Sequence, residues 1–370
     1  MLADGQTLYV GGTFQNVGGA ARNHLAALDT TTGNATPFDP GASSHVAALA
    51  RTGSILYVGG YFASIGAKTR HHLAAMDMTS GALTDFAPNV DGGVNVLLLD
   101  GTTMYLGGTV ASVENQNRNR LAAVDTTANT GNATAFDPAV NGSVSALVLD
   151  GTTLYVGGSF TIVHGQGRNR LAAVDTGTSL PTTFNPNANS SVLVLALDGT
   201  TLYAGGFFSQ IGGQTRNNIG AVDTGTGNAT AFDPNADNFV QSFALDGTTL
   251  YVGGFFNNIG GQARHKLAAF DTTSGNVTSF DPGLGAQAHA LARDGTTLYV
   301  AGAYTTIAGQ ARNRLSSLDT TLNTSNATSF NPNADGPVNA LFLRGTTLYV
   351  GGFFESMGTR PAAHFNILTP

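Results

Sequence analysis

Short apolar runs alternate with turns rich in Gly, Thr and Asn along the whole chain. Within the runs the hydrophobic positions are continuous, as in Leu-Leu-Leu at residues 97–99 followed by Met-Tyr-Leu at 104–106. A continuous apolar run indicates a strand that is covered on both faces, whereas strict alternation would leave one face in water. The pattern therefore predicts an all-β fold with sheets packed against sheets, and it predicts no helix.

One motif recurs eight times and divides the chain into repeats. The string Leu-Tyr-Val-Gly-Gly, with small variations, begins at Leu8, Leu56, Met104, Leu154, Leu202, Leu250, Leu298 and Leu348. Successive copies are 48 or 50 residues apart. Self-similarity at such a period is typical of repeat architectures in which each repeat is one supersecondary unit.

Each repeat contains four short runs that suit strands. In the fourth repeat the run at 144–149 leads into Asp150-Gly151, for which we predict a type I′ hairpin with positive φ at both central residues. The Leu-Tyr-Val strand then ends in two glycines, where we expect the backbone to bend or to approach a neighbour closely. A Gly-containing connection with Arg168 precedes the third strand, 171–175, and the fourth run ends at Phe184-Asn185-Pro186.

Eight such units arranged face to face around an axis would cover both sides of every strand. We therefore predict an eight-bladed β-propeller of four-stranded antiparallel blades, with residues 1–370 forming a single domain. In a seven-bladed alternative one repeat would have no place. The first strand is expected to be shortened, because the first repeat opens with only residues 1–5, and the last blade is expected to lack its fourth strand.

The order of these elements resembles a kelch repeat, and the resemblance covers nearly the whole chain. The residues that carry it are the apolar first strand, Leu-Tyr-Val-Gly-Gly, an Ala-Val-Asp third strand and an aromatic fourth strand. The chain is also similar to the repeats of bacterial secreted propellers of unassigned role. It departs from the kelch pattern because that fourth strand usually carries Trp, and this chain has none. The resemblance implies the fold and leaves the function open.

Composition removes several classes of function. Charged residues make up 11% of the chain, the formal net charge is −7, and no basic run occurs, so we expect no nucleic-acid partner. Cysteine is absent, which excludes disulfides and thiolate chemistry. No apolar stretch approaches the length of a membrane span. If the protein is exported, this sequence is its mature part or an excerpt.

The end of the last repeat departs from the pattern. After Arg360 the chain runs to Pro370 without a fourth strand. We expect this blade to present an unpaired edge through which another copy associates, with Phe365, Ile367 and Leu368 at the contact. The alternative is a simple three-stranded last blade.

Repeated polar residues are expected to serve the blade. The Asp that ends each third strand and the Arg that precedes it, such as Asp175 and Arg168, should bond to the backbone or to each other at turns and between blades. A ring of such groups as a ligand site is the alternative. The eight histidines have no metal-ligand spacing, and no catalytic motif occurs. We therefore predict no enzymatic activity, no metal and no cofactor.

The connections between repeats are the candidate site for a polar ligand. They are rich in Asn and Asp, and the candidate residues are Asp91, Asn141, Asn189, Asp237 and Asp335. Sugars are the ligand considered first, and calcium is the alternative; turn formation alone would also explain these residue types. Eight of ten Tyr and 13 of 21 Phe occupy repeated places, so we expect the aromatic residues to be mostly core and not a recognition surface.

Taken together, these features predict a non-catalytic structural or protein-interaction module that is secreted or displayed at the cell surface. Its partner would be another copy of itself or another surface protein. The location is inferred from a Thr-, Asn- and Gly-rich sequence with only two lysines, Lys68 and Lys266. The alternative is a carbohydrate-binding propeller that binds glycans at several equivalent sites between blades.

Overall fold

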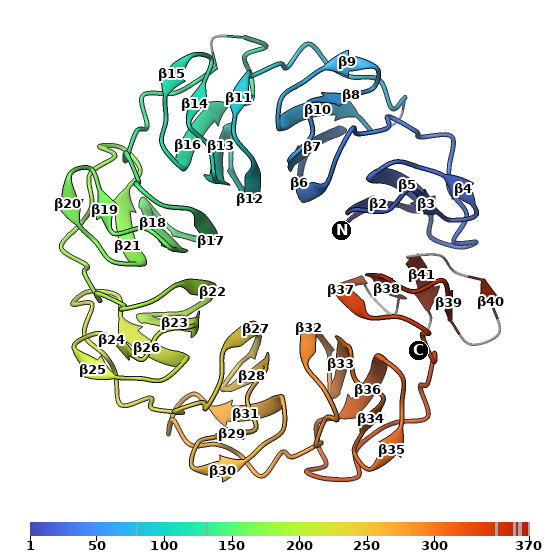
Figure 1. Ribbon diagram of the computed structural model, residues 1–370, viewed down its shortest axis with the longest axis vertical. Coiled ribbons are helices and arrows are strands. Elements are labelled where there is room, and N and C mark those ends of the chain that lie inside the picture. The colour runs from blue at the N-terminus through green and yellow to red at the C-terminus, as the bar shows by residue number, and fades with distance from the viewer. Residues whose placement is uncertain (79, 131, 345–346, 358–359, 362–364, 369–370) are drawn as a thin grey trace. The chain divides into compact units, whose positions relative to one another are not determined.

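The fold is known from a computed structural model that describes residues 1–78, 80–130, 132–344, 347–357, 360–361 and 365–368. These residues form 41 short strands and no helix (Figure 1). The all-β prediction is therefore confirmed.

Every repeat is built on the same plan, for which the fourth repeat serves as the example. Strand β17 (Val144–Asp150) pairs with β18 (Thr153–Gly158), and β18 pairs with β21 (Leu171–Asp175), all antiparallel. The sheet order is β17-β18-β21. Between β18 and β21 the chain forms a small separate hairpin of β19 (Ile162–Val163) and β20 (Gln166–Gly167).

The same three strands recur in the other repeats. The first strands are β1 (Leu2–Asp4), β6 (Val46–Thr52), β12 (Val94–Asp100), β22 (Val192–Asp198), β27 (Val240–Asp246), β32 (Ala288–Asp294) and β37 (Val338–Arg344). The second strands are β2 (Thr7–Gly11), β7 (Ile55–Gly60), β13 (Thr103–Gly108), β23 (Thr201–Gly206), β28 (Thr249–Gly254), β33 (Thr297–Gly302) and β38 (Thr347–Gly352). The third strands are β5 (Leu25–Asp29), β10 (Leu73–Asp77), β16 (Leu121–Asp125), β26 (Ile219–Asp223), β31 (Leu267–Asp271), β36 (Leu315–Asp319) and β41 (Phe365–Leu368).

The small hairpins are also repeated. They are β3 (Asn16–Val17) with β4 (Ala20–Ala21), β8 (Ser64–Ile65) with β9 (Lys68–Thr69), β14 (Ser112–Val113) with β15 (Gln116–Asn117), β24 (Gln210–Ile211) with β25 (Gln214–Thr215), β29 (Asn258–Ile259) with β30 (Gln262–Ala263), β34 (Thr306–Ile307) with β35 (Gln310–Ala311), and β39 (Ser356–Met357) with β40 (Arg360–Pro361). One further strand, β11 (Val90–Asp91), pairs with β14.

The fourth run is shorter than the sequence predicts in the first seven repeats. In the fourth repeat it touches the third strand through a single bridge, Val174 to Pro181. The ladder ends there because the N–H of Phe184 donates to the hydroxyl of Thr182 (3.2 Å) instead of to a strand. This local bond turns the chain out of the sheet, so the blades have three strands and one bridged segment in place of four full strands.

The two tight turns of a repeat differ from the sequence prediction. At the hairpin from β17 to β18, Gly151 has a φ of +54°, and Thr152 is not in the left-handed region. Glycine therefore occupies the first central position, as in a type II′ turn, because the β-branched Thr disfavours positive φ. The predicted left-handed pair occurs in the small hairpin, where His164 and Gly165 have φ values of +48° and +71°.

The last repeat contains a third strand, β41, which pairs with β38 through Leu348 to Leu368 and Gly351 to Phe365. Leu368 is partly buried against the apolar core that the seventh and eighth repeats share. The side chains of Phe365 and Ile367 lie outside the part that the structure describes. Self-association through these three residues therefore stays a prediction.

The chain divides into two compact units. The first comprises Met1–Thr30 and Asn34–Asn187, and the second comprises Thr31–Gly33 and Ala188–Pro370. Inside each unit the apolar cores lie between successive sheets. One core in the first unit joins Tyr57 and Ala75 of the second repeat to Met104, Leu106 and Val124 of the third. Because each sheet shares its faces with its neighbours, no repeat could bury its apolar residues alone.

The double glycine permits a close approach of two backbone segments. Gly158, the second glycine of its pair, lies against the residue that precedes β17, so that an added Cβ would collide with the carbonyl oxygen of Ser143. Gly206 meets the carbonyl of Ser191 in the same way. The close approach predicted from the sequence is therefore present in both units.

This packing predicts that Gly158→Ala destabilises the protein by about 2 kcal/mol, because backbone atoms must move to admit the methyl group. The matched control is Gly167→Ala, in the small hairpin of the same repeat, where an added Cβ meets no atom within 4 Å. Urea unfolding monitored by circular dichroism measures both. An equal effect of the two substitutions would contradict the packing argument.

Candidate functional site

The predicted ligand residues occupy one repeated position in the connections between repeats, and most of them bond to their own chain. The Oδ1 of Asn141 accepts hydrogen bonds from the backbone N–H groups of Thr161 (2.8 Å) and Ile162 (2.9 Å). Asn189 does the same with Ser209 (2.9 Å) and Gln210 (3.1 Å). These side chains fasten the connection to the start of the next small hairpin, which gives their residue types a structural reason.

Asp335, in the second unit, and Asp91, in the first, are two further candidates at this repeated position. The Oδ1 of Asp335 accepts the N–H groups of Glu355 (2.8 Å) and Ser356 (3.0 Å). At Asp91 the backbone carbonyl accepts the N–H of Ala111 (2.7 Å), while the side chain is exposed. The structure thus places the candidates separately, one in each connection, and ligand binding by them stays a prediction.

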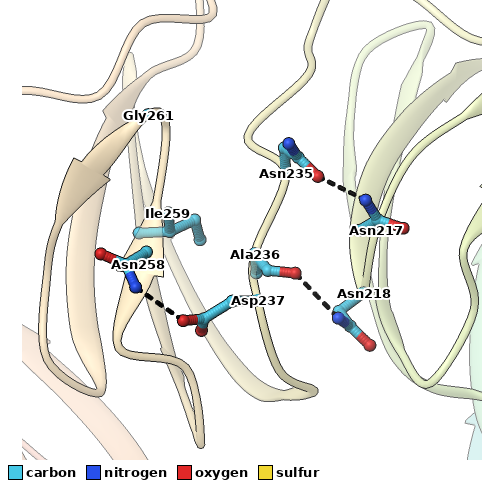
Figure 2. Close-up of a pocket in the computed structure, with 8 residues that line it drawn as sticks. All are labelled: Asn217, Asn218, Asn235, Ala236, Asp237, Asn258, Ile259 and Gly261. Atoms are coloured by element: carbon cyan, nitrogen blue, oxygen red, sulfur yellow. Dashed lines mark hydrogen bonds between the residues drawn. The ribbon is translucent and has the colours of Figure 1, made fainter.

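Asp237 is the candidate that lies in a pocket. Its neighbours come from the end of one repeat and the small hairpin of the next: Asn217, Asn218, Asn235, Ala236, Asn258, Ile259 and Gly261 (Figure 2). The pocket has a volume of about 510 Å³. Its lining is dominated by side-chain amides and one carboxylate, so it offers both donors and acceptors.

The amides in this pocket are ordered by bonds to one another and to the backbone. The Nδ2 of Asn217 donates to the Oδ1 of Asn235 (2.5 Å), and the Nδ2 of Asn218 donates to the carbonyl of Ala236 (2.8 Å). The Nδ2 of Asn258 donates to the Oδ2 of Asp237 (2.8 Å). Each residue uses only part of its bonding capacity in these contacts.

The environment of Asp237 keeps its carboxyl group ionised. Burial raises its pKa, but the hydrogen bonds donated by the side chain of Asn258 and by the backbone N–H groups of Asn257 and Asn258, together with the charge of Lys266, outweigh burial. The pKa therefore lies below the ordinary value of 3.8. At neutral pH the pocket carries a negative charge.

A second group of residues, which the sequence interpretation missed, is an exposed aromatic cluster in the second unit, formed by Phe207, Phe239 and Phe255. The ring centroids of Phe207 and Phe239 are 4.5 Å apart, and those of Phe239 and Phe255 are 4.1 Å apart. Phe207 is 50% exposed. Phe207 is therefore an exception to the expectation that the aromatic residues are mostly core.

A signal for the aromatic cluster was present in the sequence. The residue after the double glycine varies among the repeats: it is aromatic in four of them (Tyr61, Phe207, Phe255 and Phe353) and small in the other four (Thr13, Thr109, Ser159 and Ala303). A side chain that breaks the repeat is not required by the blade. The large number of repeated phenylalanines hid these departures.

A further pocket, of about 380 Å³, lies in the first unit beside Tyr9, Phe38 and Met78. The hydroxyl of Tyr9 donates to the carbonyl of Met78 (2.7 Å). Burial, followed by the charges of Asp4 and Asp77, raises the pKa of Tyr9 to about 12. The phenol is therefore held in its neutral form as part of the packing between two repeats.

The repeated Arg and Asp residues have the structural role that the sequence predicts. The guanidinium of Arg168 donates to the carbonyl of Thr182 (2.7 Å). That of Arg216 donates to the carbonyl of Thr230 (2.8 Å) and also forms an ion pair with Asp233 (3.3 Å). The Oδ1 of Asp175 accepts both the hydroxyl and the N–H of Thr178 (2.8 Å each). Both sets bond to the backbone at turns within their own repeat.

The described residues hold no group of three or more His, Asp or Glu placed to bind a metal ion. They also contain no helix of the length and hydropathy that a membrane span needs.

The comparisons with known proteins concern the fold. The chain is similar to the computationally designed protein Ika8, a propeller, with a TM-score of 0.67 and 14% identity over 99% of this chain and 97% of that one. It is also similar to a chain of the mitotic checkpoint complex, which contains WD40 repeats, with a TM-score of 0.53 and 16% identity over 85% and 84% of the two chains. The chain therefore has a β-propeller fold, as predicted from the sequence.

No known protein family and no curated protein matches the sequence. The resemblance to kelch repeats thus stays a prediction, while the repeated β-fold is shown.

The geometry around Asp237 predicts that Asp237→Ala lowers the free energy of unfolding by about 1 kcal/mol, because the N–H of Asn257 and the amide of Asn258 lose their acceptor. Asp237→Asn is expected to lose less, since Asn189 accepts two N–H groups at the equivalent position. Urea unfolding at neutral pH measures both variants.

The pH dependence follows from the lowered pKa. The stabilisation by the carboxylate is fully present above its ordinary pKa of 3.8 and is lost as the pH falls through the lower native pKa. The difference in stability between the wild type and Asp237→Ala should therefore shrink below about pH 4. A difference that grew on acidification would contradict this assignment.

Proposed function

We propose that this protein is a non-catalytic interaction module that binds a partner protein through the aromatic cluster of Phe207, Phe239 and Phe255. The propeller fold favours a protein-interaction module over other classes. The observation that carries the proposal is the stack of three rings that are at least partly exposed, of which Phe207 is half exposed.

The physics of the cluster supports recognition. Single exposed apolar side chains are common on protein surfaces, but contiguous apolar patches mark interaction sites. Aromatic residues also dominate the binding energy of many interfaces, because each ring buries a large area at a small entropic cost. The two short ring separations make Phe207, Phe239 and Phe255 one contiguous surface.

We also propose a location and a class of partner. The protein acts outside the cell or at its surface, and it binds another surface protein or a second copy of itself. The support is compositional: two lysines, 11% charged residues and a Thr- and Asn-rich sequence. Association of copies through the edge of the last blade at Phe365, Ile367 and Leu368 is a separate part of this proposal, and light scattering as a function of concentration tests it.

A library of random peptides displayed on phage tests the aromatic cluster. Peptides selected on the wild-type protein should carry aromatic or aliphatic residues, and Phe207→Ser should weaken their binding about tenfold. Serine occupies this position naturally at Ser159, so the variant is expected to fold. The matched control is Leu322→Ser, because Leu322 is equally exposed at 50% in the same unit.

The proposal fails if no peptide is enriched, or if Leu322→Ser weakens binding as much as Phe207→Ser does. In the first case the cluster has no affinity for polypeptide, and in the second case the binding is unspecific.

Carbohydrate binding is the second candidate function, and one observation favours it. The pocket at Asp237 gathers four Asn side chains and one carboxylate, which match the hydroxyl groups of a sugar.

A further inference from the structure

One residue that lines the pocket at Asp237 differs from its counterparts in all the other repeats. The residue directly before each third strand is basic in seven repeats, namely His24, His72, Arg120, Arg170, Lys266, Arg314 and His364. In the fifth repeat it is Asn218. The pocket is lined by this exception.

The backbone at this position is the same whichever side chain it bears. The described members have φ values between +63° and +66°, including Asn218 at +63° and Arg314 at +64°. Such a conformation is unusual for residues other than glycine, so the repeat itself imposes it. The exception at Asn218 therefore changes the side chain and leaves the chain path unaltered.

Asn218 meets the structural need with a shorter side chain. Its Nδ2 donates to the carbonyl of Ala236 (2.8 Å), and Arg314 donates to the equivalent carbonyl of Ala334 (2.8 Å). Lys266 instead extends to the carbonyl of Phe255 and the Oδ1 of Asn257. The side chain of Asn218 is shorter than the Arg and Lys side chains at this position in four other repeats, and it lines the pocket of about 510 Å³.

The replacement also changes the chemistry of the pocket. A guanidinium offers donors only, whereas the amide of Asn218 leaves an acceptor oxygen and one N–H for a ligand. Within the part of the chain that the structure describes, the Nδ2 of Asn235 has no partner, since its Oδ1 makes the bond to Asn217. The carboxylate of Asp237 has further lone pairs beyond those used by Asn257 and Asn258.

We propose that this pocket binds one neutral sugar ring through adjacent hydroxyl groups, with Asp237 and Asn218 as acceptors and Asn235 as a donor. A hydroxyl both donates and accepts, so a pair of adjacent hydroxyls can satisfy a carboxylate and an amide together. This inference rests on the second candidate function, carbohydrate binding, and is independent of the aromatic cluster.

Two features separate this inference from a general affinity for sugars. There is one site in the chain and not one for each repeat, because only the fifth repeat has Asn at the left-handed position. Anionic sugars are rejected, since their charge would lie beside the carboxylate of Asp237.

Saturation-transfer NMR on the whole chain tests the proposal with three neutral probes, the methyl glycosides of mannose, glucose and galactose, and one anionic probe, glucuronate. We expect transfer to at least one neutral glycoside and none to glucuronate. Asn218→Arg should reduce the affinity at least about tenfold, because it replaces the amide that lines the pocket with a longer side chain that has no acceptor; Arg occupies the equivalent position at Arg120, Arg170 and Arg314. Because Arg occupies the equivalent position in three other repeats, the variant is expected to fold.

The matched control is Asn276→Arg, which makes the same change at an exposed Asn outside the pocket and should bind as the wild type does. If binding survives Asn218→Arg, the protein binds sugars elsewhere and the assigned pocket is wrong. If no neutral glycoside receives saturation at millimolar concentration, both the pocket and the carbohydrate function are wrong. Neither result bears on peptide binding by the aromatic cluster, which has its own test.

Discussion

In several repeats the tyrosine of the Leu-Tyr-Val strand makes one repeat depend on the next. In the first unit the hydroxyl of Tyr9 reaches the carbonyl of Met78 in the following repeat, and Tyr57 bonds to the side chain of Thr126. Tyr203 bonds to Thr272 in the second unit. A buried phenol without a partner would be destabilising, so the apolar packing of two sheets and this bond must form together. The ring itself packs edge-on against the Phe that ends its own repeat, as Tyr105 does against Phe136 at 5.2 Å.

This dependence explains which parts of the fold could be predicted from the sequence. The tyrosine recurs in all eight repeats and the double glycine and the turn aspartate in most of them, and this repetition made them visible. The bridged fourth segment was overestimated, because Thr182 and Phe184 suit a strand by propensity, while the hydrogen bond between them takes the chain out of the ladder. The small hairpin was missed because its strands have two residues each, too few for a periodic pattern, although pairs such as Gly212-Gly213 mark its turn.

The candidate site was predicted only in part, because some of its residues do not recur from repeat to repeat. The recurring Asn and Asp of the connections were found, and Asp237 among them lies in a pocket, while the backbone N–H groups that Asn141, Asn189 and Asp335 accept give those residue types a structural reason as well. Asn218 was overlooked because it is a single departure within a regular pattern, and Phe207 was overlooked because its position varies among the repeats. In a protein built from near-copies, exceptions carry more functional information than shared residues do.

The left-handed residue before the third strand has a consequence for how such a protein changes over time. Its backbone is fixed from both sides: in the fifth repeat the carbonyl of Asn218 accepts the N–H of Gly206 (2.9 Å), and its own N–H donates to Phe208 (2.6 Å). The backbone conformation is therefore held by main-chain hydrogen bonds, and the side chain adds only one contact, to the carbonyl of Ala236 (2.8 Å). One codon change at such a place can open or close a cavity while leaving the scaffold intact. Gene duplication followed by drift at these eight positions would supply a repertoire of binding specificities at little risk to folding.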